Sequence, residues 1–429
     1  MSTIGTDIAL PRLLTGCSDG AMARLDRHLE VHGPLPSARA LNPRALIDVV
    51  AASGLRGRGG GAFECARKLR AVRGARGRPI VVVNGCESEP LSAKDALLIG
   101  ELPHLVLDGA ELAARAVGAE EVIVAFESSN SSARLSLEHA LKQRRAAGVD
   151  TVRFELFAAA DRFLTGQETA LVSQLNGGPP RPTFIPPRPT ARGVRRRPTL
   201  IQNVETLAHL ALIARHGAEW YRAMGTPAEP GSTLATLVGA VNNPGVYEIE
   251  CGTRLTDLFA GAGGVESEIG GLLIGGYFGS WLPAHFAGEL ELSNAALAHH
   301  NAAFGCGVVV VLPARACPVA ETVRIAIYLA TETARQCGPC VHGTAAIART
   351  LHGLAEGKAS SSAFADLERW VTELPGRGAC HHPNGLSHFV STALDTFARQ
   401  FDDHARRGPC DACAAEPVLG VPAMTSAAA

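Results

Sequence analysis

With 429 residues, 46% of them hydrophobic and 19% charged, the chain is long enough for two or three domains with a sizeable core. Its 40 basic and 41 acidic side chains nearly cancel, which argues against disorder and against nucleic acid as a partner. The stretch 1–16 has no basic segment followed by an apolar run, and the apolar window 271–288 is broken by glycines and by Pro283. We therefore expect a cytoplasmic protein whose eleven cysteines are ligands, redox groups or buried side chains rather than disulfides.

Helices and buried strands alternate through the first half of the chain. In chain order we expect a helix over 43–53 that ends at Gly54, a glycine-dense loop, a strand that starts at 79 and leaves into a polar loop, a helix over 104–118 and a strand over 121–127. This alternation predicts an α/β domain with a largely parallel sheet over residues 1–225. The proline-rich segment 177–198 should wrap over it as an ordered loop without regular structure.

Two further units follow. Residues 226–315 contain a strand, an Asn-Asn-Pro-Gly turn, a second strand, a short helix over 253–260 and the apolar run 308–313, which predicts a small α+β module. Residues 316–429 are helical in pattern from Val319 to about Arg406, with 323–336 as one helix. The fold class is therefore α/β with a small β-containing module and a C-terminal helical domain.

The loop 54-GLRGRGGGAF-63 has five glycines, at positions 54, 57, 59, 60 and 61. Such a loop can take positive φ and point successive N–H groups at an anion, and Lys68 could add a positive charge. A dinucleotide-binding glycine loop should follow a strand, whereas this one follows a predicted helix. The loop is therefore either a phosphate cradle or a flexible turn.

Polar residues also gather where predicted strands end. The loop 84-NGCESEPLSAKD-95 follows a buried strand, and the ends of parallel strands are where ligands bind in open α/β sheets. Similar groups occur at 166-GQETA-170 and 202-QNVET-206. Each alone is typical of a solvated loop, but together with the glycine loop they indicate a binding site.

These segments carry a resemblance to a known family. The glycine loop with Lys68, the NGxExEP…KD loop, GQETAL, PTxxxNVETL, VNNPGVYE and QCGPC occur in the order found in the NADH-oxidising flavoprotein subunit of respiratory complex I, and in its relatives in NAD-linked hydrogenases and formate dehydrogenases. The resemblance runs from about Gly54 to about Phe389. It implies an FMN- and NADH-binding α/β domain, a β-grasp module of the soluble-ligand-binding type, and a helical bundle that holds a [4Fe–4S] cluster.

The resemblance also implies roles for particular residues. Glu87 and Glu168 match acidic residues close to the flavin and the nicotinamide, and we take them as the catalytic candidates. The cofactor-binding candidates are Gly57, Arg58, Gly59, Gly60, Gly61, Phe63, Lys68, Asn84, Glu89, Gly166, Gln167, Gln202, Asn203 and Thr206.

The chain departs from the family pattern at several of these positions. Cys86 stands where the family has a carboxylate, and Gln202 replaces the first of two adjacent asparagines. In the pattern Tyr-x-Cys-Gly-Glu-Glu, Phe163, Thr165 and Gln167 take the places of the tyrosine, the cysteine and the first glutamate.

The string 336-QCGPC-340 has the spacing of a thioredoxin dithiol, but it follows a predicted helix rather than a strand. By resemblance it is the cluster motif, with Cys337, Cys340 and Cys380 as three ligands and Ala334 in place of a fourth cysteine. Cys410, from 408-GPCDAC-413, is our candidate for the vacant position. His342, His381, His382, a three-ligand cluster, zinc bound together with the tail cysteines and no metal at all remain open. We expect Cys17, Cys65, Cys251, Cys306 and Cys317 to be isolated small side chains.

By resemblance, the protein should transfer hydride from NAD(P)H to FMN and then single electrons to an iron–sulfur cluster. The expected partners are NADH, a ferredoxin-like or thioredoxin-like iron–sulfur subunit and a membrane redox subunit. One alternative is a non-catalytic scaffold of the same fold with a structural metal. The other is a dithiol oxidoreductase at Cys337 and Cys340.

Overall fold

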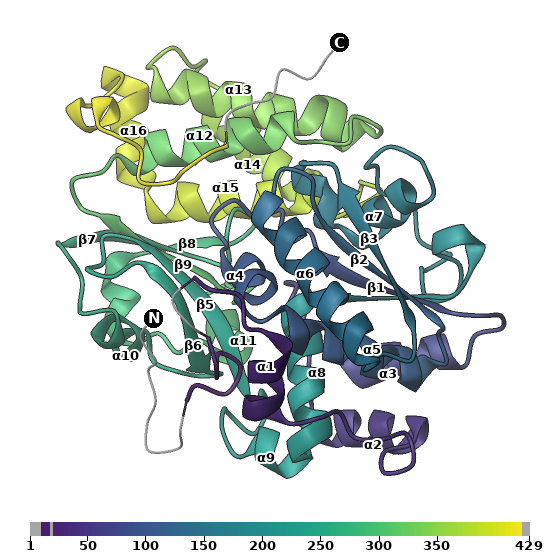
Figure 1. The fold of residues 1–429 in the computed structure, drawn as a ribbon. Coiled ribbons are helices and arrows are strands. Elements are labelled where there is room, and N and C mark those ends of the chain that lie inside the picture. The colour runs from purple at the N-terminus through teal and green to yellow at the C-terminus, as the bar shows by residue number, and fades with distance from the viewer. Residues whose placement is uncertain (1–9, 18–19, 423–429) are drawn as a thin grey trace.

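The computed structural model describes residues 10–17 and 20–422. Residues 1–9 and 423–429 lie outside the described residues. The predicted domains 1–225 and 316–429 include these ends. Residues 1–9 also make up the first part of the stretch 1–16, in which we expected no signal peptide. Figure 1 shows three parts in contact: an α/β part, a small second sheet and a bundle of helices stacked above both.

The α/β part is built on a four-stranded parallel sheet in the order β3-β2-β1-β4. Its strands are β1 (Ile80–Gly85), β2 (Glu121–Glu127), β3 (Arg153–Ala159) and β4 (Thr199–Asn203). The central strands β1 and β2 are buried almost throughout, as their continuous apolar runs predict for a sheet covered on both faces. The expected parallel sheet is thus confirmed.

Nine helices belong to this part of the described chain, and several of them cover the sheet (Figure 1). They are α1 (Leu25–His32), α2 (Pro43–Ser53), α3 (Cys65–Arg73), α4 (Lys94–Glu101), α5 (Pro103–Val117), α6 (Ser131–Ala147), α7 (Glu168–Leu175), α8 (Val204–His216) and α9 (Ala218–Arg222), with the short turns η1 (Phe163–Gly166) and η2 (Val194–Arg196). The helix α2 ends at Gly54, whose φ of 75° gives the left-handed cap that the sequence predicted. Helices α5 and α8 pack so closely that a Cβ at Gly109 would lie 1.9 Å from the Leu207 carbonyl oxygen, so only glycine fits there.

The second sheet is mixed, in the order β6-β5-β9-β7-β8, with β5 and β9 parallel and the other pairs antiparallel. Its strands are β5 (Ser232–Gly239), β6 (Gly245–Glu250), β7 (Ile269–Ile274), β8 (Ser280–Leu282) and β9 (Val308–Pro313), and its short helices are α10 (Leu255–Gly261), η3 (Ala284–Gly288) and α11 (Asn294–Ala298). The Asn-Asn-Pro-Gly segment joins β5 to β6, as its turn chemistry predicts.

The C-terminal part is all-helical. It contains α12 (Pro318–Thr331), the π-helical turn η4 (Pro339–Gly343), α13 (Thr344–Ala355), α14 (Ala363–Glu373), α15 (His382–Thr396), α16 (Ala398–Arg407) and the turn η5 (Asp411–Ala414). The predicted helix over 323–336 is too long, because α12 ends at Thr331 and residues 332–338 form a loop. This loop carries Cys337 away from the helix.

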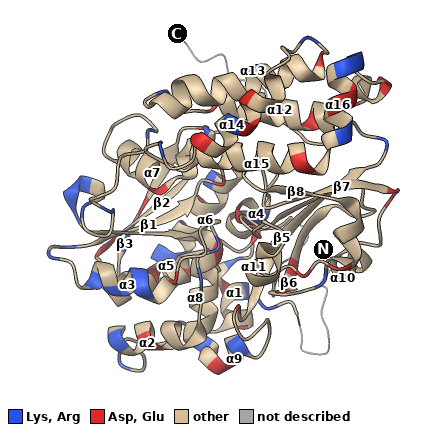
Figure 2. Cartoon of the chain, turned by 180° about the vertical axis from the view of Figure 1, so that it is seen from behind, with Lys and Arg blue, Asp and Glu red and all other residues tan. Residues whose placement is uncertain are grey.

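Figure 2 shows basic and acidic residues of both signs over all three parts, in keeping with their near balance along the chain. Within the described residues, every helix is too short or too polar to cross a bilayer.

Candidate functional site: a polar sheet edge and two thiol groups

The carboxyl ends of β1 and β4 lie side by side and bring two predicted site residues together. Asn84 on β1 is the direct neighbour of Asn203 on β4 in the parallel register. The Asn203 side chain caps α8 by accepting a hydrogen bond from the Glu205 N–H (2.9 Å), and its amide donates to Asp95. The Asn84 amide donates to the Gly166 carbonyl oxygen (2.9 Å). One edge of the sheet thus gathers three of the polar segments singled out in the sequence.

The glycine loop lies against this edge and leaves donors free. The Gly57 N–H bonds to the Phe63 carbonyl (2.8 Å) and the Arg58 N–H to the Thr206 hydroxyl (2.9 Å), which close the two sides of the loop. Within the described part of the chain, the exposed N–H groups at positions 59–61 have no hydrogen-bond acceptor. Gly60 has φ 95°, and a Cβ at Gly59 would lie 3.3 Å from that of Asn203. Consecutive free N–H groups on glycines suit an anion, so the loop fits a phosphate.

Lys68 supplies a positive charge beside the loop. Its ammonium donates to the Ile201 carbonyl oxygen on β4 (2.8 Å) and forms an ion pair with Glu168 at the start of α7. Both side chains are only partly exposed, at 20% and 33%. The structure therefore brings Lys68 and Glu168 together from helices on either side of β4.

The side chains of two predicted cofactor-binding residues, Gln167 and Gln202, are already engaged in hydrogen bonds within the protein. The Gln167 side-chain oxygen caps α7, accepting from the N–H groups of Thr169 (2.9 Å) and Ala170 (2.8 Å). The amide of Gln202 is buried and donates to the Cys65 sulfur (3.3 Å). Gln167 thus contributes to the site by fixing the start of α7, and Gln202 joins β4 to Cys65 at the start of α3.

A buried charge cluster lies beneath the edge. The Lys94 ammonium is 2.7 Å from an Asp95 oxygen and 3.1 Å from a Glu205 oxygen, and the Asp95 N–H donates to Glu87 (2.9 Å). Burial and the neighbouring Glu87 raise the pKa of Asp95 to about 7. Burial opposes the charged form of Glu205 too, but Lys94, His209 and Arg58 lower its pKa to about 2. One ammonium thus faces three carboxylates, which favours retention of a proton in the cluster near neutral pH.

Glu89 takes a different position from the one expected. Its carboxylate accepts hydrogen bonds from the backbone N–H groups of Tyr277 (2.8 Å) and Leu91 (3.4 Å), so it joins the α/β part to the β7–β8 turn rather than pointing at a cofactor. Burial raises the pKa of Glu89 to about 8.

The Arg58 side chain also departs from the expectation. Its guanidinium turns away from the sheet edge and donates to the Tyr221 hydroxyl (3.0 Å) and the Ser232 carbonyl oxygen (3.0 Å), where it is buried at the start of the second sheet. Only its backbone N–H remains part of the glycine loop. Polar contacts between the two parts therefore hold the Arg58 guanidinium. The glycine loop keeps the Arg58 backbone but not its positive charge.

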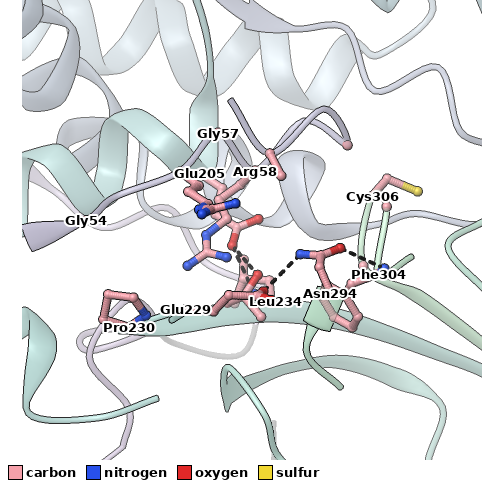
Figure 3. A pocket seen from close by; sticks show the side chains of 16 residues that line it. Gly54, Gly57, Arg58, Glu205, Glu229, Pro230, Leu234, Asn294, Phe304 and Cys306 are labelled. Atoms are coloured by element: carbon pink, nitrogen blue, oxygen red, sulfur yellow. Dashed lines mark hydrogen bonds between the residues drawn. The ribbon is translucent and has the colours of Figure 1, made fainter. Parts of the chain in front are cut away.

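Figure 3 shows Arg58 and Glu205 on one side of a pocket in this joint, with Glu229 and Asn294 on the other, linked by a hydrogen bond of 2.9 Å. The cavity volume is about 20 Å³, room for little more than one water molecule. This pocket is therefore a packed joint, too small for a flavin. Phe63, at the end of the glycine loop, is 45% exposed and lies 5.5 Å from the Arg67 guanidinium.

The three predicted cluster cysteines lie near one another: Cys337 and Cys340 follow α12, and Cys380 lies just before α15. Burial, and then the nearby thiols of Cys337 and Cys380, raise the pKa of Cys340 to about 12. Ala334 is buried at the start of the same loop. Because Cys337 follows α12 rather than a strand, the thioredoxin arrangement is absent from this described region.

The fourth predicted ligand is elsewhere. Cys410 lies in a separate group with Cys317, His404 and Cys413, whose ligand atoms are all within 4.8 Å of one another. The prediction that Cys410 completes the cluster is therefore contradicted by its position, and Cys317 is not isolated as we expected. His382, another candidate, is buried and bonds to the Leu329 carbonyl oxygen (2.7 Å). The C-x-x-C of the tail was the available sequence signal, but it did not reveal that Cys317 and His404 join it.

Comparison with known proteins agrees with this geometry. Residues 50–212 match the model of the Nuo51 FMN-binding domain, 234–270 the SLBB domain and 320–404 the iron–sulfur binding region of NADH-ubiquinone oxidoreductase F. The chain is 29% identical to an F-type chain of the NADH-quinone oxidoreductase of Rhizobium meliloti over 386 residues, covering 86% of this chain and 90% of the relative. It is 27% identical to the F-type chain of the NADH-quinone oxidoreductase of Aquifex aeolicus, covering 94% of this chain and 96% of the relative.

A solved structure, that of an NAD⁺-reducing [NiFe]-hydrogenase in the air-oxidised state, superposes with a TM-score of 0.83 at 30% identity, covering 94% of this chain and 68% of that chain. The residues at the sheet edge, the glycine loop and the thiol loop all lie within the matched regions. The chain therefore belongs to the family of NADH-oxidising, FMN-binding flavoprotein subunits of respiratory complex I and NAD-linked hydrogenases, which carry a [4Fe–4S] region.

Proposed function

We propose that this chain is an NADH dehydrogenase flavoprotein subunit that passes the electrons of NADH, one at a time, to an iron–sulfur cluster in its own helical part and then to a partner subunit. The observation that carries the proposal is the row of free N–H groups at 59–61, next to Lys68 and the paired Asn84 and Asn203. When bound, FMN accepts two electrons as hydride and releases them singly, which suits a one-electron cluster.

Each residue at the sheet edge and the glycine loop has a separate role in binding the cofactors. The N–H groups at 59–61 and the Lys68 ammonium bind the flavin phosphate, because they offer donors and positive charge at one place. Asn84 and Asn203 line the edge that would receive the flavin ring, and exposed Phe63 would offer it an apolar surface. Glu168, partly exposed at the start of α7 and paired with Lys68, would orient the nicotinamide by hydrogen bonding.

We assign Glu87 an electrostatic role in the buried cluster rather than a direct contact with substrate. It accepts the Asp95 N–H and belongs to the buried cluster under the sheet edge, and burial raises its pKa. A carboxylate in such a cluster sets the local electrostatic potential on which the reactivity of a bound flavin depends.

The cluster is held by Cys337, Cys340 and Cys380. With Ala334 at the fourth position and Cys410 in another group, we propose a cluster with three protein thiolates. The electron acceptor is a ferredoxin-like or thioredoxin-like iron–sulfur subunit, and a membrane redox subunit is reached through it. We also place the chain in the cytoplasm, where such a complex would draw on NADH.

The test is an anaerobic visible spectrum of the full chain, with FMN, iron and sulfide measured on the same sample before and after NADH. Flavin and iron–sulfur absorption that bleaches with NADH is expected. Lys68→Met should weaken FMN binding by about tenfold, equivalent to roughly 1.4 kcal/mol. Arg70→Met is the matched control, since Arg70 lies on the same helix, is exposed and pairs with Asp48.

A colourless protein that contains metal but neither binds FMN nor oxidises NADH would favour the non-catalytic scaffold. That alternative draws on the neutral Gln167 and Cys86 at positions where the family pattern has carboxylates. In that case Gln167→Glu and Cys86→Asp together should create activity that the original chain lacks.

A further inference from the structure

Four potential metal ligands from three separate segments meet at one end of the helical part. Cys317 directly precedes α12 and His404 lies in the last turn of α16. In the C-terminal tail, Cys410 directly precedes the turn η5 and Cys413 lies within it. All four ligand atoms lie within 4.8 Å of one another. The group is distinct from Cys337, Cys340 and Cys380, the cysteines of the predicted iron–sulfur site.

The separations are those of ligands around a single ion. Sulfur atoms are 3.5 Å apart for Cys317 and Cys413 and 3.7 Å apart for Cys410 and Cys413. The His404 Nε2 atom is 3.4 Å from the Cys317 sulfur and 3.9 Å from that of Cys413. A tetrahedral zinc ion with Zn–S bonds of about 2.3 Å and Zn–N bonds of about 2.0 Å separates its ligands by about 3.8 Å (S to S) and about 3.5 Å (S to N).

Neither a disulfide nor an iron–sulfur cluster explains these distances. The sulfur atoms are too far apart for a bond, which needs about 2.05 Å, and the three cysteines are free. The four ligands of a [4Fe–4S] cluster each bind a different iron, so the cluster spreads them further apart than one ion does.

The histidine is oriented for ligation. His404 is 3% exposed, and its Nδ1 atom is 3.0 Å from the carbonyl oxygen of Ala355, the last residue of α13. A carbonyl can only accept, so Nδ1 carries the proton and Nε2 presents its lone pair to the sulfurs. A backbone carbonyl behind the coordinating imidazole is the usual support of a metal-binding histidine.

The surrounding backbone suits thiolates. The Cys317 sulfur accepts the Ala320 N–H (3.4 Å) at the N-terminus of α12, where the helix dipole favours negative charge. Beyond the group, the Glu321 carboxylate accepts the N–H groups of Val418 (2.9 Å) and Leu419 (3.1 Å), which holds the tail along α12.

From this geometry we propose that Cys317, His404, Cys410 and Cys413 form a structural zinc site that fastens the C-terminal tail to the helical part. Three thiolates and one imidazole complete a closed four-ligand set with no open position, which is the pattern of structural rather than catalytic zinc. Binding displaces the thiol protons into solvent, and no electron transfer is involved.

The first experiment measures zinc and iron in the anaerobically purified full chain, followed by X-ray absorption at the zinc edge. We expect one zinc ion per chain in addition to iron, with three sulfur neighbours at about 2.3 Å and one nitrogen at about 2.0 Å. A zinc-free chain that does not take up zinc with its thiols reduced would overturn the proposal, and so would zinc surrounded by oxygen.

Variants separate this site from the iron–sulfur cluster. Cys410→Ser, at an exposed position, and His404→Ala should reduce zinc severalfold and leave iron and flavin unchanged. Cys17→Ser, remote from both thiol groups, is the control and should change neither metal. If Cys410→Ser instead removed iron and spared zinc, the tail would be a cluster ligand after all and the zinc site would be wrong.

Discussion

The helical part contains two thiol groups with the same C-x-x-C spacing and different geometry. In the tail group, Cys410 and Cys413 join Cys317 and His404 within 4.8 Å, and a backbone carbonyl orients the imidazole. In the other group, Cys337, Cys340 and Cys380 are three thiols on a loop and a helix start, next to Ala334. The difference teaches that spacing along the chain does not identify the metal. The number of converging ligands and their separation do.

The largest expected effect is on the three-thiol group. Cys340→Ala should abolish iron and sulfide binding, because a cluster cannot be held by two remaining thiolates, and should leave zinc at one per chain. Iron, sulfide and zinc measured on one sample check this. If both metals disappeared together in a folded variant, the two groups would be one site and the comparison would fail.

Removing zinc from the proposed tail site should lower the thermal stability of the protein and leave its visible absorption unchanged. A zinc chelator should lower the melting temperature by roughly 5–10 °C, because the ion would link three separate segments of the helical part, and should leave the visible spectrum unchanged. Differential scanning fluorimetry and absorption on the same sample measure both. The His404→Ala variant is the control, since it should already have the lower melting temperature and should not respond to the chelator.

Adding a fourth cysteine to the three-thiol group should make its iron–sulfur cluster more stable in air. Ala334→Cys adds a fourth thiol at a buried position whose backbone contacts Cys340, so iron should be lost in air several times more slowly. Ala359→Cys, elsewhere in the helical part, controls for an added cysteine. Equal rates of iron loss in the Ala334→Cys variant and the original chain would show that position 334 does not face the cluster.

The contact between Glu89 and the Tyr277 N–H joins the α/β part to the second sheet without a metal. Burial raises the pKa of Glu89 to about 8, so the folded state binds its proton more tightly than the unfolded state, and stability is lost as pH rises from the ordinary glutamate value toward 8. Glu89→Gln keeps an oxygen for the Tyr277 N–H and removes this loss. Its melting temperature relative to that of the original chain should therefore rise by a few degrees between pH 5 and pH 8.5. Glu120→Gln, at an exposed position, should show no such trend.

The smallest effect is expected on the outer face of α16. Arg406 and Asp402 form an exposed ion pair (2.9 Å) in the helix that carries His404. Arg406→Ala should change the free energy of unfolding by about 0.5 kcal/mol or less, because exposed pairs contribute little. A loss comparable to that of His404→Ala would mean that α16 itself, rather than its metal ligand, stabilises this end of the molecule.

Much of the fold followed from local patterns. The helix 43–53 with its glycine cap, the strand 121–127 and the Asn-Asn-Pro-Gly connection are all as expected, because periodicity and turn chemistry act over a few residues. The candidate flavin edge was also predictable in outline, since parallel strands bring their carboxyl ends together.

What the sequence did not predict depends on contacts between distant segments. Arg58 and Glu89 carry motif positions, yet their side chains serve joints between parts, which no local pattern encodes. Cys317 and Cys413 are 96 positions apart, and only the packing of α12 against α16 makes them neighbours. The end of α12 at Thr331 likewise reflects the loop that carries the thiols.

The β7–β8 turn touches all three parts of the molecule. Glu89 of the α/β part holds the Tyr277 N–H, the Tyr277 hydroxyl donates to the Gly420 carbonyl oxygen in the tail, and Phe278 packs edge-on against Phe163 and His382. Electron transfer between two centres slows steeply as their separation grows. This turn therefore links the α/β part, which contains the polar sheet edge, to the helical part, which contains the thiol loop, and such a link would hold two redox centres placed there at a fixed separation.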